Sequence, residues 1–156
     1  MSSRSQLGNT LIRADLNVPI RKKVVKDNFR IIKAIEYLED LRKISKSVTF
    51  LSHLGRPDGI NLDYSIKPVA EEMSLLLNEE VLFINSLHGP EVKNHLDENP
   101  GKVFLLENLR FHNEETENNL NFAKKVTENF DSFILDAFGA AHRNHASIVS
   151  FGNFLE

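Results

Sequence analysis

The sequence predicts an α/β domain in which helices cover both faces of a mostly parallel sheet, a three-layer α/β/α arrangement. Short apolar runs alternate with helix-period stretches along the chain. Alternating strands and helices are typical of parallel sheets, whose two faces are both covered. In addition, 156 residues, of which 41% are hydrophobic and 26% charged, suit one domain with one continuous core.

The apolar patterns predict five strands and four helices in alternating order. The strands are expected at residues 11–16, 48–51, 81–84, 103–106 and 133–135. The helices are expected at residues 28–41, 65–77, 90–96 and 120–130. Either Asp27 or Asn28 can cap the first helix, and Ser65 is expected to cap the second, with Pro68 tolerated in its first turn.

Three stretches carry no helix or strand pattern. Glycine and proline mark residues 53–64 as a loop, and polar composition marks residues 108–117 as another. The tail, residues 146–156, has no clear pattern. We find no internal repeat, low-complexity tract or linker in the sequence.

Composition excludes several classes of function. The net charge of −3 does not favour binding to nucleic acid or to an anionic membrane. The absence of cysteine excludes disulfides, thiolate chemistry and cysteine-based zinc sites, and is compatible with the cytoplasm, where we expect the protein. The N-terminus lacks the apolar region of a secretory signal, and no apolar run approaches the length of a membrane span.

The arginines are distributed unevenly. The chain holds eight of them, at positions 4, 13, 21, 30, 42, 56, 110 and 143. The three that follow Arg42 each come just after a predicted strand, whereas the helices of the same stretch carry lysine (Lys67, Lys93, Lys124, Lys125). Four of the six histidines lie in the same segments after strands: His53, His112, His142 and His145.

This distribution predicts an anion site at one edge of the sheet. Ligands of open α/β sheets bind beyond the carboxyl ends of the strands. Arginine offers a planar fork that holds phosphate or carboxylate with two hydrogen bonds, whereas lysine is a flexible point charge. The alternative is that each arginine pairs with a neighbouring acidic residue on the surface. Three arginines in equivalent positions, each within three residues of a histidine, favour a basic cleft for a small polyanion.

Five segments resemble, in order and approximate spacing, the signature segments of the phosphoglycerate kinase family. They are RADLNVP (13–19), NFRI (28–31), SHLGRPDG (52–59), LLENLRFH (105–112) and DAFGAAHRNHAS (136–147). The resemblance implies a Rossmann-like domain with a six-stranded sheet, although the sequence pattern itself gives five strands. It also implies that residues 1–156 form the N-terminal, substrate-binding domain, because the family is more than twice this length.

The resemblance assigns roles to residues near the first strand. Asp15 and Asn17 are similar to the pair that contacts the glycerate oxygens of the substrate, although such a pair before Pro19 also suits a turn. Arg30 resembles the arginine that meets the transferring group, for which we predict a catalytic as well as a substrate-binding role. The alternative for Arg30 is an exposed residue in the first turn of a helix.

It also assigns roles to the residues after later strands. His53 and Arg56 resemble substrate ligands, with Gly55 allowing close approach of the backbone, and Arg110 and Arg143 resemble the remaining arginines around the non-transferred phosphate. Glu107 and Asp136 are expected to orient these arginines or to close strand ends. His142 and His145 have a spacing that could suit a metal, but nearby arginines repel a cation, so no metal site is predicted.

The implied function is that of a phosphoglycerate kinase, a phosphotransferase of glycolysis that moves a phosphoryl group between 1,3-bisphosphoglycerate and ADP. The expected partners are 3-phosphoglycerate or 1,3-bisphosphoglycerate and a C-terminal nucleotide-binding domain that carries Mg-ATP or Mg-ADP. We expect that domain to be absent, because no phosphate-binding glycine motif of the G-x-x-x-x-G-K-[ST] or G-x-G-x-x-G type occurs. The chain alone is therefore expected to bind no cofactor and to be inactive. The alternatives are a stand-alone, non-catalytic module that binds a phosphorylated metabolite, and one half of a split gene.

Overall fold

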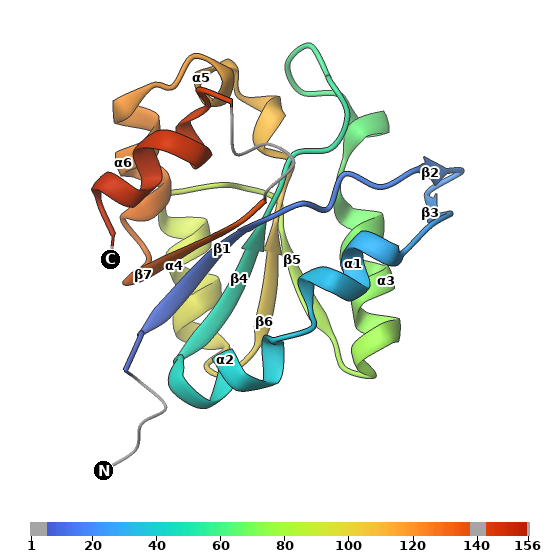
Figure 1. Ribbon diagram of the computed structural model, residues 1–156, viewed down its shortest axis with the longest axis horizontal. Coiled ribbons are helices and arrows are strands. Elements are labelled where there is room, and N and C mark those ends of the chain that lie inside the picture. The colour runs from blue at the N-terminus through green and yellow to red at the C-terminus, as the bar shows by residue number, and fades with distance from the viewer. Residues whose placement is uncertain (1–5, 138–142, 156) are drawn as a thin grey trace.

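The computed structural model describes residues 6–137 and 143–155 and contains a parallel sheet of five strands (Figure 1). Across the sheet the strands run in the order β5-β6-β4-β1-β7, and every neighbouring pair is parallel. Their bounds are β1 Asn9–Ala14, β4 Ser47–Leu51, β5 Val81–Ile84, β6 Val103–Leu106 and β7 Ser132–Asp136. The predicted α/β class with a mostly parallel sheet is confirmed. Each of the five predicted strands overlaps an observed strand, although β1 begins and ends two residues before the predicted run 11–16.

The sixth strand implied by the family resemblance is not found among the described residues. The two remaining described strands, β2 (Ile20–Arg21) and β3 (Val24–Val25), form a separate antiparallel hairpin. Lys22 and Lys23 form its tight turn with φ of 51° and 61°. Positive φ at both central residues of a two-residue turn matches the right-handed twist of the flanking strands, so the hairpin closes on itself.

Helices cover both faces of the sheet, which gives the three layers that the sequence predicts (Figure 1). On one face α1 (Phe29–Ala34), α2 (Leu38–Ile44) and α3 (Lys67–Leu77) pack over a core that includes Ile12 and Phe50. On the other face α4 (Pro90–Glu98), α6 (Leu120–Thr127) and the C-terminal turns pack over a core that includes Leu11 and Leu51. Neighbouring strand residues thus enter opposite cores, as the alternation of a strand requires.

The predicted helix 28–41 is in fact two helices, α1 and α2. The N–H groups of Glu36 and Leu38 bond to carbonyls three residues back, which interrupts the helical series between the two. The N-cap residue of α1 is Asn28, but its side chain makes no capping bond and donates to Glu72 instead. The carboxylate of the preceding Asp27 accepts from the Phe29 N–H at 3.0 Å. The Ser65 hydroxyl accepts from Lys67 N–H at 3.3 Å, although the residue before α3 is Ile66.

The stretch predicted as loop 108–117 contains short helical segments. They are a 3₁₀ turn, η3 (Leu109–Phe111), and one turn of α-helix, α5 (Asn113–Thr116). The tail also has structure, a π-helical turn η5 (Ala146–Ser150) followed by a 3₁₀ turn η6 (Phe151–Asn153). A further 3₁₀ turn, η2 (Leu62–Tyr64), lies in the predicted loop 53–64. None of the helices in the described part of the chain has the length and apolar character to cross a membrane.

Candidate functional site

The seven residues predicted to bind substrate line two cavities beyond the carboxyl ends of the strands. Arg56, Arg110 and Arg143 line a cavity of about 220 Å³. Asp15, Asn17, Arg30 and His53 line a second cavity of about 190 Å³, together with Arg13 and Arg143. Arg143 therefore lines both cavities, so they are neighbours, and we call the two together the arginine site.

Asn108, the second residue after β6, fixes the loop that carries Arg110. Its buried side-chain oxygen accepts from the N–H groups of Leu54 and Arg110 at 3.1 and 3.0 Å. Its amide nitrogen donates to the carbonyls of Leu54 and Tyr64 at 2.8 and 2.9 Å. Asn108 thereby holds the segments after β4 and β6 together, which sets the position of Arg110 relative to His53.

Gly55 connects the two cavities through its backbone. Its N–H donates to Asn17 Oδ1 at 3.0 Å and its carbonyl accepts from Arg110 Nη1 at 3.0 Å. Its φ is +62°, and a Cβ at this position would come within 2.6 Å of the Tyr64 ring. A glycine is therefore required here by both conformation and space. The group that approaches the Gly55 backbone closely is the Tyr64 ring of this chain.

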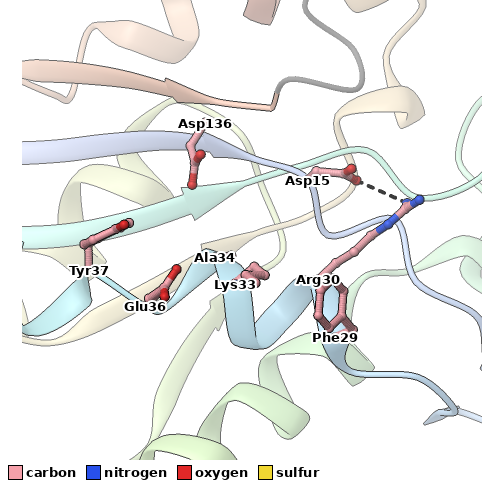
Figure 2. A pocket seen from close by; sticks show the side chains of 8 residues that line it. All are labelled: Asp15, Phe29, Arg30, Lys33, Ala34, Glu36, Tyr37 and Asp136. Carbon is pink, nitrogen blue, oxygen red and sulfur yellow. Dashed lines mark hydrogen bonds and ion pairs between the residues drawn. The ribbon is translucent and has the colours of Figure 1, made fainter.

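Arg30 extends from α1 to the loop after β1, where it meets Asp15 (Figure 2). Its Nη1 lies 3.4 Å from Asp15 Oδ1 and donates to the Asn17 carbonyl at 2.8 Å. The Arg30 side chain is 52% exposed and also borders a third cavity of about 310 Å³, between α1 and the end of β7. Asp136 borders that cavity as well, and burial raises the pKa of its carboxyl. Arg30 thus lies at the open rim of the arginine site.

Positive groups crowd the inner part of the site. Burial, followed by the charges of Arg143 and Arg56, lowers the pKa of Arg110. Arg110 is buried, yet its Nε and Nη2 find no hydrogen-bond partner within residues 6–137 and 143–155. Burial, followed by the charge of Arg110, also lowers the pKa of His145, which lines the 220 Å³ cavity. Unpaired buried donors and repelling cations are both relieved by an anion.

Sequence reasoning missed Arg13, which lies in β1 and is only 1% exposed. Its Nη2 contacts His53 Nδ1 at 2.8 Å, and its Nε donates to Ser147 Oγ at 2.9 Å. Burial lowers the pKa of Arg13 to about 10. The signal was present, since Arg13 is a charged residue that directly follows the apolar pair Leu11 and Ile12 inside a predicted strand.

Glu115 was missed as well. Its Oε1 accepts from the Ser147 N–H at 2.6 Å, and its burial raises the pKa of the carboxyl despite that bond. Glu115 and Ser147 join the short helix α5 to the tail, and Ser147 in turn contacts Arg13. Nothing in the sequence around Glu115 distinguishes it from its acidic neighbours Glu114 and Glu117.

Of the remaining predicted residues, Glu107 closes a strand end. Its carboxylate accepts from Ser65 Oγ at 2.7 Å, Ile66 N at 2.9 Å and Asn108 N at 2.8 Å. His142, which was considered with His145 as a metal pair, lies outside the described residues. Within the described ranges no group of three or more His, Asp or Glu side chains is placed to hold a metal ion.

Several known proteins that are similar to this chain are phosphoglycerate kinases. A family model described as phosphoglycerate kinase matches residues 6–156. Phosphoglycerate kinase of Borreliella afzelii is 47% identical over 147 residues, which cover 93% of this chain and 37% of that protein. The Schistosoma mansoni phosphoglycerate kinase is 45% identical over an alignment 157 positions long, which covers 89% of this chain and 38% of that protein.

Solved structures give the same result. Phosphoglycerate kinase from Coxiella burnetii superposes with a TM-score of 0.82 at 34% identity, covering 98% of this chain and 39% of that one. The enzyme from Pyrococcus horikoshii gives a TM-score of 0.80 at 29% identity, again over 98% of this chain and 39% of that one. This chain therefore spans less than two fifths of the length of these relatives. Since the family model covers nearly the whole sequence, the chain belongs to the phosphoglycerate kinase family.

Proposed function

We propose that this chain supplies the 3-phosphoglycerate-binding part of a phosphoglycerate kinase, which transfers a phosphoryl group reversibly between 1,3-bisphosphoglycerate and ADP. The observation that carries the proposal is the group of three arginines around the 220 Å³ cavity, whose lining includes no carboxylate. Because two buried donors of Arg110 have no partner among residues 6–137 and 143–155, this cavity suits a ligand oxygen that carries negative charge.

The two cavities suit the two ends of such a ligand. In this proposal Arg56, Arg110 and Arg143 hold the non-transferred phosphate. The second cavity, which mixes Asp15 and Asn17 with cations, receives the glycerate part, where hydroxyl and carboxylate oxygens need both acceptors and donors. The three-carbon chain of 3-phosphoglycerate then sets the distance between its phosphate and its carboxylate.

Arg30 has the catalytic role in this proposal. Its exposed position at the rim leaves it free to contact a group that arrives from outside the chain. Phosphoryl transfer gains mainly from positioning and from stabilising charge on the equatorial oxygens, which a guanidinium can supply. In the absence of ligand, Asp15 and the Asn17 carbonyl hold the Arg30 side chain toward the site.

We assign the Mg-nucleotide to a separate C-terminal domain, because the sequence holds no phosphate-binding glycine motif and the chain spans less than two fifths of the length of its relatives. Without that domain, we expect the isolated chain to have no kinase activity. A role in glycolysis and a cytoplasmic location complete the proposal.

Calorimetric titration of the 156-residue chain with 3-phosphoglycerate tests this function. We expect saturable binding that weakens as salt rises, because an open site leaves the charges partly screened. Glycerate and inorganic phosphate, each carrying one end of the ligand, should bind at least tenfold more weakly. Equal affinity for inorganic phosphate and 3-phosphoglycerate would contradict the assignment of two subsites. Turnover in a coupled assay with ATP, magnesium and 3-phosphoglycerate would contradict the expected inactivity.

A further inference from the structure

The buried contact between Arg13 and His53 determines which nitrogen of the histidine ring carries the proton. Arginine has only N–H donors, so the ring nitrogen that faces it must accept. That nitrogen is Nδ1, at 2.8 Å from Arg13 Nη2. A neutral imidazole with an unprotonated Nδ1 has its hydrogen on Nε2. We propose that Arg13 is a positioning residue, which fixes His53 as the Nε2–H tautomer so that the ring donates a hydrogen bond to the bound substrate.

Arg13 is itself held so that it cannot turn away from the ring. It lies in β1, between β4 and β7, and its guanidinium also donates to Ser147 Oγ and to the Ala14 carbonyl. The Ser147 backbone is in turn bonded to buried Glu115 at 2.6 Å. The fork of Arg13 is therefore occupied by protein groups on three sides. This arrangement makes Arg13 a support for His53, whereas Arg110 has two donors that no described residue engages.

The surroundings of His53 keep its ring neutral. Burial is the largest effect, and the cations that face it come from each neighbouring segment: Arg13 from β1, Arg110 from η3, and Arg143 with His145 from the segment before η5. Together they lower the pKa of His53 to about 3. The carboxylate of Asp15 lines the same cavity. Because Arg13 occupies Nδ1, the contact that fixes the tautomer also adds to the effect of burial in keeping the ring neutral.

The other ring nitrogen is available to a ligand. No hydrogen bond within the described residues engages Nε2, and the ring lines the 190 Å³ cavity. A neutral donor at this place binds an oxygen of the glycerate part without adding another full charge to a site already crowded with arginine. This inference rests on the proposed function for the identity of the ligand, but the tautomer itself is a property of the free chain.

Long-range ¹H–¹⁵N NMR correlation of the histidine rings tests the tautomer directly in the ligand-free chain. At pH 7 we expect His53 to show an unprotonated Nδ1 and a protonated Nε2, unchanged down to pH 5.

In Arg13→Met the ring should show a mixture of tautomers or an imidazolium at pH 5, and the affinity for 3-phosphoglycerate should fall at least tenfold. Ser147→Ala, which leaves the donor to Nδ1 in place, should keep the Nε2–H form. Arg42→Met, which removes a partly buried arginine of α2, is the matched control. It should change neither the tautomer of His53 nor the affinity for 3-phosphoglycerate.

A protonated Nδ1 in the wild-type chain at pH 7 would overturn the proposal, and so would an unchanged tautomer in folded Arg13→Met. The wild-type spectrum tests the tautomer of His53 even if the Arg13→Met variant does not fold. Arg13→Lys, which keeps one donor and the charge, should restore the Nε2–H form at least in part. If the wild-type chain has the expected tautomer but does not bind 3-phosphoglycerate, the proposed function fails and the positioning of His53 by Arg13 stands.

Discussion

The two edges of the sheet use arginine in opposite ways. At the amino ends of the strands, Arg42 forms a two-bond ion pair with Glu79, which precedes β5, and donates to the Gly101 carbonyl, which precedes β6. The hydrogen bonds to Glu79 raise the pKa of Arg42. At the carboxyl ends, burial and the charges of other arginines lower the pKa of Arg110.

This difference separates a structural arginine from a binding arginine. Arg42 has protein carboxylates as partners, so its charge is compensated in the folded chain. Arg110 is more deeply buried but keeps two donors without partners in the described part of the chain. A fold keeps such a group at a cost in stability, which is typical of residues retained for binding. The predictions below test whether the two edges behave differently when each arginine is removed.

The largest expected effect is that of Arg110→Met on the binding of 3-phosphoglycerate. Charge-assisted hydrogen bonds contribute roughly 1.5–3 kcal/mol, so the dissociation constant should rise about 10- to 150-fold. The free energy of unfolding should change little. The substitution removes the bond from Arg110 Nη1 to the Gly55 carbonyl, but it also removes two buried donors that have no partner among the described residues and relieves repulsion by Arg143 and Arg56. Calorimetric titration and chemical denaturation measure the two quantities. Unchanged affinity with a clear loss of stability would make Arg110 a structural residue like Arg42.

A smaller effect should appear in the pH dependence of stability. In the folded chain the pKa of His53 is lowered to about 3, from the ordinary histidine value of about 6.5. A depressed histidine pKa stabilises the folded state above pH 6.5, and that contribution is lost as the pH falls toward 3. By pH 5 the loss should reach at most about 2 kcal/mol.

His53→Gln, which cannot be protonated, should remove this part of the pH dependence. Denaturation of both chains between pH 7.5 and 5 measures it, and His95→Gln on α4 provides the control for loss of a histidine elsewhere. Parallel stability curves for the wild-type chain and His53→Gln would show that the His53 ring is not held neutral by its surroundings.

The smallest effect is expected for Arg42→Met. The Arg42 side chain is 26% exposed and Glu79 29%, and partly exposed ion pairs contribute about 1 kcal/mol or less. The free energy of unfolding should fall by that amount, whereas the affinity for 3-phosphoglycerate should not change. A change in affinity similar to that of Arg110→Met would mean that the two edges are coupled, and the contrast between them would be lost.

The sequence predicts the sheet well because each strand is a short apolar run with clear boundaries. The runs at Val81 and Val103 begin and end where β5 and β6 do. The break between α1 and α2 could not be predicted, because apolar residues keep helical spacing through Ile35 and Leu38. Hydrogen bonds made three residues back, rather than any proline or glycine, end the first helix.

The arginine distribution predicts the location of the site for a simple physical reason. Arg56, Arg110 and Arg143 follow strands that end at one edge, so the parallel topology brings them to one cavity. The supporting residues are harder to predict. The contact of Arg13 with Ser147 spans 134 positions, and that of Glu115 with Ser147 spans 32. No local pattern encodes such pairs, because only the folded chain brings them together.

The most direct test of the account is residue-resolved NMR of the arginine Nε–H groups during titration with 3-phosphoglycerate. Arg110 Nε has no partner within the described residues, so its signal should shift saturably, along with those of Arg56 and Arg143. The Arg42 signal, at the opposite edge, should stay in place. Binding without a shift at Arg110, or shifts centred on Arg42, would contradict the assignment of the carboxyl edge as the phosphate-binding site.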